Sequence, residues 1–175
     1  MTPLTNEAVQ QELELLTRTL TVARKDLGDL PQRKLASMLG VAKTSVVDWE
    51  TGQDSPTVRN LIGWARILML RLVIVDRIGV QVPCSVPREH GETWETYELR
   101  RLTMVLRDVR NAYPMLPQLE VANRGGFSRV SLVHWESLRT PPRTLGLIRW
   151  AMALDCRVRL APMRPRRRIL ATVEG

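Results

Sequence analysis

The chain contains one stretch of sequence twice, and this internal repeat constrains the fold more than any other feature. The two copies, residues 30–50 and 116–136, lie 86 positions apart and align without a gap. A repeat of this kind indicates two related structural units, so it is the starting point for assigning every other element. The identical pairs include Pro31/Pro117, Gln32/Gln118, Ala36/Ala122, Gly40/Gly126, Ser45/Ser131, Val47/Val133, Trp49/Trp135 and Glu50/Glu136.

Each copy has the pattern of two short helices joined by a tight turn. Pro31 suits the first turn of a helix, Gly40 can adopt the positive φ of the turn, and a second helix is predicted from about Lys43 to Glu50. In a helix-turn-helix of this kind the second helix enters a DNA groove. Two unlike copies therefore predict a chain that reads two adjacent stretches of a non-palindromic DNA site.

The sequence around each copy repeats the same plan. Helices are predicted before the copies, at about 5–26 and 93–112, and after them, at about 57–68 and 143–154. The β-branched segments 71–75 and 157–161 predict short strands, with 79–83 and 168–173 as candidate return strands. We also hypothesise that the two main strands pair in one shared sheet, which would fix the two units relative to each other.

The fold class that follows is mainly α. It consists of two tandem helix-turn-helix units, each followed by a short β-strand or hairpin. We predict an N-terminal domain at 1–82, a linker at 83–91 that contains two prolines and a glycine, and a second, diverged domain at 92–175.

The charge of the chain favours a polyanionic partner. The formal net charge is +8, and it is unevenly distributed: residues 1–86 carry 10 basic and 9 acidic side chains, whereas residues 87–175 carry 16 and 9. All 16 of the latter bases are arginine, which suits phosphate and guanine because its planar fork donates two parallel hydrogen bonds. A GC-rich genome would also favour arginine over lysine, but it does not explain the positive excess.

The first copy resembles the Cro/C1-type (XRE-like) helix-turn-helix family of phage and bacterial repressors. The resemblance covers about 20–70 and rests on the run Gln-x-x-Leu-Ala-x-x-x-Gly-Val followed by Ser-Val-x-x-Trp-Glu-x-Gly. It implies that much of this pattern is structural. The side chains expected in the core are Leu35, Ala36, Val41, Val46 and Trp49.

The same resemblance implies that the remaining polar side chains of the first copy contact DNA. Gln32 would anchor a phosphate, while Lys43, Thr44 and Asp48 would face base edges, where an amine, a hydroxyl and a carboxylate can each read a different base. Solvated surface side chains are the alternative. The predicted DNA-binding residues are Gln32, Lys43, Thr44, Ser45, Asp48, Thr51 and Gln53.

The second copy keeps the apolar skeleton (Val121, Ala122, Phe127, Leu132, Trp135) but changes the exposed residues. Gly125 replaces Leu39, which predicts a looser turn, and Leu138 replaces Gly52, which predicts a different turn after the recognition helix. A degenerate copy kept for packing is the alternative to DNA reading. The predicted DNA-binding residues here are Gln118, Ser128, Arg129, Val130, Ser131, His134, Arg139 and Arg143; the basic cluster 163–168 is either a backbone or minor-groove contact or a solvated tip.

The layout of the whole chain is similar to the immunity repressors of cluster A mycobacteriophages. That resemblance implies a repressor that maintains lysogeny and immunity in the host cytoplasm, binding asymmetric operator and stoperator sites as a monomer through both domains. Two alternatives stay open. One is an antitoxin-type helix-turn-helix protein, and the other is a recombination-accessory protein that bends DNA.

Other classes of protein are not favoured by the sequence. No apolar run approaches the 18 or so residues of a membrane span, and the N-terminus does not resemble a signal peptide. Cys84 and Cys156 are isolated, and neither His90 nor His134 has neighbours at metal-ligand spacing. We therefore expect no enzyme activity, cofactor, metal or small-molecule ligand, and double-stranded DNA as the partner.

Overall fold

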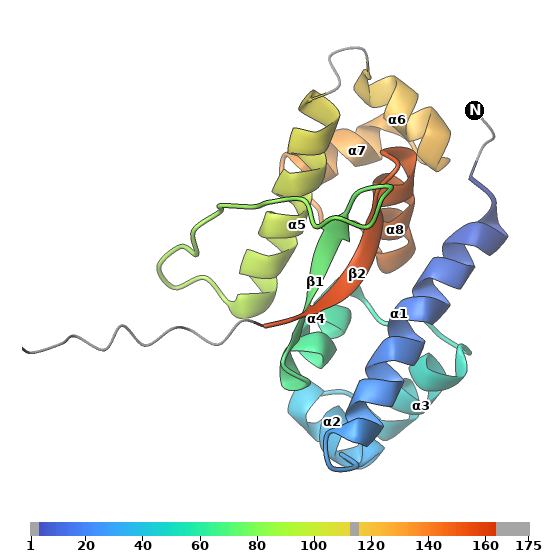
Figure 1. Cartoon of the computed structure of the whole chain (residues 1–175), viewed down its shortest axis with the longest axis vertical. Helices are drawn as coiled ribbons and strands as arrows, with labels where there is room; N and C mark the ends of the chain where they lie inside the picture. The colour runs from blue at the N-terminus through green and yellow to red at the C-terminus, as the bar shows by residue number, and fades with distance from the viewer. Residues whose placement is uncertain (1–3, 113–115, 164–175) are drawn as a thin grey trace, which may run out of the picture.

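The computed structural model describes residues 4–112 and 116–163, and in these the chain is mainly helical with one two-stranded sheet. This confirms the predicted fold class. We call α1 to β1 the first unit and α5 to β2 the second unit (Figure 1). The elements are α1 (Asn6–Asp26), α2 (Gln32–Leu39), α3 (Lys43–Thr51), α4 (Val58–Ile67), β1 (Leu70–Val75), α5 (Trp94–Asn111), α6 (Gln118–Gly125), α7 (Arg129–Glu136), α8 (Thr144–Ala153) and β2 (Arg157–Pro162).

Hydroxyl side chains begin the two long helices. Thr5 caps α1 by accepting a hydrogen bond from the backbone N–H of Ala8, and Thr93 caps α5 through the N–H of Thr96. Each cap satisfies one of the backbone donors that a helix N-terminus leaves free. The local sequence therefore fixes where both helices start, close to the predicted positions.

The two strands pair with each other, as hypothesised from the sequence. β1 and β2 are antiparallel, with Val73 opposite Arg159 and Ile74 opposite Val158. The hairpin predicted after β1 is reduced to an isolated bridge between Val75 and Gln81. The candidate return strand 168–173 lies outside the described residues, as does all of the basic cluster 163–168 except its first residue.

The first helix of each unit packs against the other unit. α1 contacts α3 of its own unit but also α8 and β2, and α5 contacts α7 of its own unit but also α4 and β1. Figure 1 shows the result: α1 and α5 flank the sheet on opposite sides, and the α2–α3 and α6–α7 pairs lie at opposite ends of the molecule. We call α1 and α5 the exchanged helices, because each packs against the other unit. Together with the sheet, they fix the position of one helix-turn-helix relative to the other.

One apolar core runs through both units. It includes side chains of α1, α4 and β1 together with those of α5, α8 and β2. Trp64 of α4 and Trp150 of α8 are fully buried within it. The division into separate domains at 1–82 and 92–175 stays a prediction, and this shared core is the feature against which it must be tested.

The turn inside the second helix-turn-helix is not looser than the first, contrary to the sequence-based prediction. Gly40 has φ 68° and ψ 31°, and Gly126 has φ 69° and ψ 38°. Gly125 instead makes room for an aromatic ring, because a Cβ at that position would lie 2.0 Å from Cε1 of Phe127. The substitution of glycine for Leu39 is therefore coupled to the larger side chain that follows it.

The turn after the recognition helix is also retained, so the prediction of a different turn was wrong. Leu138 adopts φ 59°, in the same left-handed region as Gly52 with φ 75°. The hydrogen bond from Gln53 N to Asp48 O (2.8 Å) has its counterpart from Arg139 N to His134 O (3.0 Å). The backbone tolerates a non-glycine residue there because the flanking hydrogen bonds fix the turn.

Candidate nucleic-acid interface

The two predicted recognition helices, α3 and α7, are anchored by apolar and aromatic side chains on one face. Val46 and Leu132 are fully buried. Trp49 stacks on Trp64 with ring centroids 6.1 Å apart and the planes tilted by 33°. In the equivalent pair of the second unit, Trp135 and Trp150, the ring centroids are 5.9 Å apart and the planes are tilted by 33°. The same support therefore fixes both helices.

The first helix-turn-helix is locked by a buried cluster that sequence reasoning missed. Arg24 lies at the end of α1, and its Nε is 2.7 Å from Oε1 of Glu50. Both side chains are about 6% exposed. Gln32, at the start of α2, donates from Nε2 to Oε2 of the same carboxylate at 2.6 Å. One glutamate thus joins the end of the recognition helix to two other helices.

The second unit contains the same cluster at positions shifted by 86. Arg110 Nε lies 2.6 Å from Glu136 Oε1, and Gln118 Nε2 donates to Glu136 Oε2 at 2.8 Å. The 86-residue offset is the signal that could have found Arg24 and Arg110, because both occur at the same place in the repeat. This ion pair is less buried than that of the first unit, since the Arg110 side chain is 16% exposed, but its bonding pattern is the same.

The clusters bear on the predicted phosphate contacts of Gln32 and Gln118. Each side-chain amide uses one of its two N–H groups on the buried glutamate, which leaves the second N–H for another acceptor. Both side chains are half-buried at a helix N-terminus, where backbone N–H groups also favour a phosphate. The phosphate contact stays a prediction.

The other predicted DNA-binding side chains lie on the outer surface of the two helix-turn-helix units. Those of the first unit follow the solvent side of α3 and the turn after it. Those of the second unit do the same on α7, except Arg143, which is the N-cap residue of α8. The exposed residues are Lys43, Thr44, Thr51, Gln53, Ser128, Arg129, Val130, Arg139 and Arg143, and the half-buried ones are Ser45, Asp48, Ser131 and His134. Among the described hydrogen bonds and ion pairs, none uses the side chain of Lys43, Asp48, Arg129 or His134.

Two predicted contact residues have local structural roles. Ser128 caps α7 by accepting a hydrogen bond from the N–H of Ser131 at 3.0 Å, and their hydroxyls lie 2.8 Å apart. Thr51 donates its hydroxyl to the carbonyl oxygen of Val47 at 2.9 Å. Sequence alone did not separate these roles from DNA contact, because capping residues and phosphate-binding residues are chemically alike.

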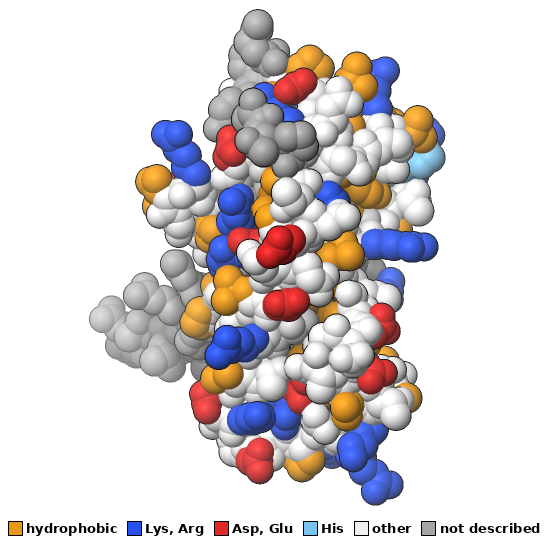
Figure 2. Space-filling model, turned by 90° about the vertical axis from the view of Figure 1, so that its right-hand side faces the viewer, with side chains coloured by type: hydrophobic (Ala, Val, Ile, Leu, Met, Phe, Trp, Pro, Cys, Tyr) orange, Lys and Arg blue, Asp and Glu red, His pale blue; other side chains and the backbone are white. Residues whose placement is uncertain are grey.

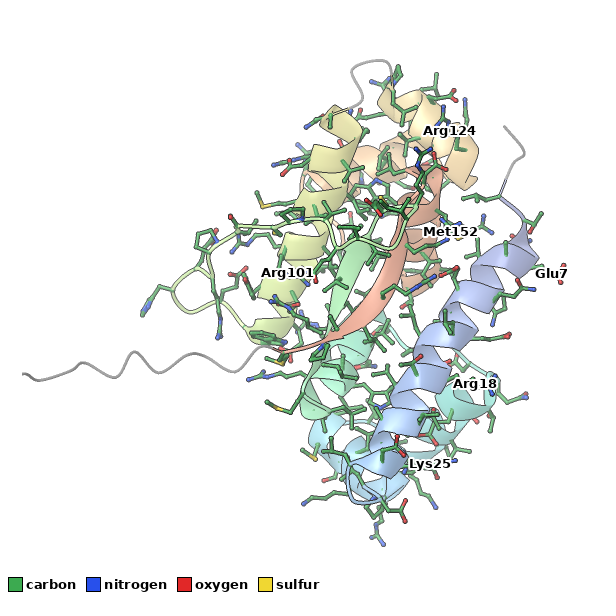
Figure 3. All side chains as sticks on the ribbon, viewed as in Figure 1. Glu7, Arg18, Lys25, Arg101, Arg124 and Met152 are labelled. Carbon is green, nitrogen blue, oxygen red and sulfur yellow. The ribbon has the colours of Figure 1, made fainter. Side chains whose placement is uncertain are left out.

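The flank of the molecule along α1 is a poor candidate for the interface. Figure 2 shows this side, and its acidic and basic side chains are interspersed rather than gathered by sign. In Figure 3 the side chains labelled on α1 include both Glu7 and the basic Arg18 and Lys25. A surface with mixed charge gives little net attraction to a polyanion, so the ends of the molecule carry the candidate interface.

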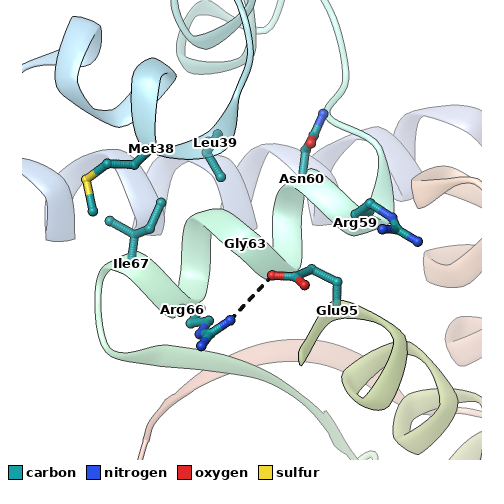
Figure 4. A pocket seen from close by; sticks show the side chains of 8 residues that line it. All are labelled: Met38, Leu39, Arg59, Asn60, Gly63, Arg66, Ile67 and Glu95. Carbon is teal, nitrogen blue, oxygen red and sulfur yellow. Dashed lines mark ion pairs between the residues drawn. The ribbon is translucent and has the colours of Figure 1, made fainter. Parts of the chain in front are cut away.

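A pocket of about 370 Å³, lined by both polar and apolar side chains, lies between α2, α4 and the start of α5 (Figure 4). Arg66 and Glu95 form an ion pair of 3.7 Å across it and so connect the two units. The second unit fills the corresponding space with Arg149, which stands where the first unit has Gly63 and donates to the carbonyl oxygen of Gly125. The pocket is therefore a packing difference between the units.

Comparison with known proteins supports the first unit directly. A family model described as helix-turn-helix matches residues 22–72, from the end of α1 into β1. Residues 22–72 are a helix-turn-helix domain of the Cro/C1 type. Such a domain is a DNA-binding module of transcription regulators, and α3 is its recognition helix. Searches among curated proteins and solved structures gave no match to the chain.

The described residues show few other features with functional chemistry. No described helix is both long and apolar enough to cross a membrane. Within residues 4–112 and 116–163, no group of three His, Cys, Asp or Glu side chains is placed to hold a metal ion. Cys84 and Cys156 are free thiols, and burial raises the pKa of the Cys156 thiol to about 11. That thiol is therefore held in its neutral form.

Proposed function

We propose that the chain is a sequence-specific transcriptional repressor that binds double-stranded DNA as a monomer through both helix-turn-helix units. The observation that carries the proposal is the contrast between the buried and the exposed residues of the two units. The Arg–Glu–Gln cluster and the paired tryptophans are kept in both. Selection for packing alone would not require the second unit to keep a solvent-exposed recognition helix.

The exposed residues differ in a way that suits unlike DNA sequences. Lys43, Thr44 and Asp48 of α3 correspond to Arg129, Val130 and His134 of α7. Lysine and arginine both donate to guanine, whereas a valine can contact only the methyl group of thymine and a histidine can donate where an aspartate accepts. The two units would therefore bind asymmetric sites, in which the halves share some positions and differ at others.

The finer biological role rests on the resemblance of the whole layout to the immunity repressors of cluster A mycobacteriophages. On that basis the chain would maintain lysogeny and superinfection immunity by acting at operator and stoperator sites in the host cytoplasm. The excess of arginine in the second half supports a DNA-binding rather than a purely structural second unit.

Footprinting of the full chain on phage genomic fragments tests the proposal, with Arg129→Ala as the informative variant. We expect short protected sites, and about tenfold or greater loss of affinity in the variant, because a good guanine contact is worth roughly 1–3 kcal/mol. Arg18→Ala, on the mixed-charge flank, is the control and should bind as the wild type does. Unchanged binding by Arg129→Ala, or no protected site at all, would contradict the proposal.

A further inference from the structure

Two of the ion pairs between the units are related by the repeat, whereas Arg66–Glu95 and Arg159–Glu12 have no counterpart. Arg71 of β1 pairs with Glu98 of α5, with Nη2 2.5 Å from Oε1. Shifting both residues by the repeat length of 86 gives Arg157 of β2 and Glu12 of α1, and these also pair, at 3.3 Å. Each unit therefore holds the other with the same contact, which is the relation that a twofold axis produces.

The strand register locates that axis. Val73 and Arg159 are opposite each other in the sheet, and they are also equivalent positions of the repeat. Leu72 faces Leu160 while Ile74 faces Val158, so each pair is converted into the other by exchanging the units. An antiparallel pair with this register has a local twofold axis through Val73 and Arg159. The contacts of α1 with α8 and of α5 with α4 are reciprocal under the same exchange of units.

A cavity on the loops before α4 and α8 gives independent support. It has a volume of about 650 Å³ and is lined by 55–59 of the first unit and 141–145 of the second, which are equivalent positions of the repeat, together with Leu99 of α5. Thr144 donates its hydroxyl to the carbonyl oxygen of Pro56 across this junction. The exposed Arg59 and Arg143 lie in the lining, so the junction between the two recognition units is basic.

We infer that the chain is a single-chain pseudo-dimer whose two recognition helices read half-sites of opposite polarity. The inference rests on the proposed function and adds the arrangement of the DNA target. A duplex has its own local twofold axes, and paired helix-turn-helix units related by such an axis bind inverted half-sites about one helical turn apart, roughly 34 Å. The DNA site is then an imperfect inverted repeat. Its two halves differ in sequence because the base-contacting residues of α3 and α7 differ.

The same arrangement assigns the reading positions. Lys43 and Arg129 occupy equivalent positions and face equivalent base pairs at the same distance from the centre of the site. Asp48 and His134 face a second equivalent pair, at which the two halves differ. Arg59 and Arg143 lie nearest the axis and contact the backbone over the centre of the site, where phosphate contacts position the protein without reading sequence.

Selection from a library of randomised DNA duplexes tests the polarity directly, using the full chain throughout. The wild type should select one site with two unlike halves. In Arg129→Lys/Val130→Thr/His134→Asp, both units carry the same three reading residues, and we expect it to select a more nearly perfect inverted repeat. Its affinity for the wild-type site should fall by roughly tenfold or more. The reciprocal variant, Lys43→Arg/Thr44→Val/Asp48→His, should select an inverted repeat of the other half.

Exchanging all six residues between the units separates the possible arrangements. With inverted half-sites, the exchanged protein binds the wild-type duplex turned end for end, so it selects the same sequence as the wild type. With direct half-sites, it would select the two halves in exchanged order, and this result would overturn the inference while leaving the proposed function intact.

A wild type that enriches no sequence would overturn the proposed function as well. Selection unaffected by the α7 changes would also overturn the inference, because α7 would not be reading bases. All substituted residues lie on the outer surface, and circular dichroism checks that each variant is folded.

Discussion

At the scale of single residues, the buried glutamates at the ends of the recognition helices carry the geometry of the interface. Glu50 accepts from Arg24 and Gln32, and its side chain is almost fully buried. Removal of one partner from a buried ion pair leaves the other charge without compensation, which costs roughly 3–5 kcal/mol. We therefore expect Glu50→Ala to lower the free energy of unfolding by about 3 kcal/mol, measured by urea denaturation.

The exposed Glu14 of α1 provides the matched control for this variant. A surface substitution of this kind changes stability by no more than about 0.5 kcal/mol, so Glu14→Ala should unfold close to the wild type. Equal effects of Glu50→Ala and Glu14→Ala would show that the buried cluster does not stabilise the fold.

A second prediction concerns the coupled pair Gly125 and Phe127. A Cβ at position 125 would lie within 2.0 Å of the Phe127 ring, so Gly125→Ala must displace the ring or the backbone. We expect a loss of about 2 kcal/mol, in the range of overpacked cores. Phe127→Val, which copies Val41 of the first unit, should reduce the cost of Gly125→Ala to roughly 0.5 kcal/mol or less in a double-mutant cycle. Additive effects would contradict the coupling.

At the scale of elements, the segment that joins the units is fixed to α5 by an ion pair. Arg100 donates from Nε to Glu92 at 2.8 Å, and this hydrogen bond lowers the pKa of Glu92 from 4.5 to about 2. A carboxyl whose pKa is lower in the folded state stabilises the fold above its unfolded pKa and loses that effect as the pH falls. The contribution is therefore complete above about pH 5 and disappears toward pH 2.

Glu92→Gln tests this pH dependence. The variant should be less stable than the wild type near neutral pH, and the difference should shrink as denaturation is repeated between pH 4.5 and pH 2. Glu89→Gln is the control, because Glu89 faces the same guanidinium at 3.6 Å but its side chain is 72% exposed. A difference between Glu92→Gln and the wild type that does not vary with pH would contradict the assignment.

The helices and both helix-turn-helix units were predictable from the sequence because their signals are local. Apolar spacing located α1 and α5, while Pro31, Gly40 and the repeat located the turns. Which surface those helices cover was not predictable, since the apolar stripe of α1 fits α4 of its own unit as well as α8 of the other. The ion pairs Arg24–Glu50 and Arg157–Glu12 join residues distant in sequence, and only comparison of the two halves of the chain, in which both pairs recur 86 positions apart, could have indicated them.

The candidate site was predictable to a similar extent. The family resemblance and the internal repeat predicted that Lys43 and Arg129 lie on the exposed faces of their helices, where the structure has them. The roles of Ser128 as a cap and of Gln32 as a partner of Glu50 depend on atomic geometry that residue type does not specify. Arg59 escaped notice because its equivalent in the second unit is Leu145, so the repeat gave no sign of it.

At the scale of the whole molecule, the exchanged helices and the shared sheet predict that the two halves depend on each other. In a fragment of residues 1–82, β1 would lose β2, α4 would lose α5 and α1 would lose α8. We expect the fragment to unfold at a lower urea concentration than the full chain, which should unfold in one transition. An equal midpoint for the two would show that residues 1–82 form an independent domain, as the sequence predicted.

The central claim is that one chain places two helix-turn-helix units on one DNA site. The most direct test is the stoichiometry of the complex, measured by native mass spectrometry on a duplex that carries one footprinted site, together with the affinities of Lys43→Ala and Arg129→Ala. We predict one chain per duplex and weakened binding in both variants. Two chains per duplex, with only Lys43→Ala weakened, would contradict the account and make the second unit a dimerisation element.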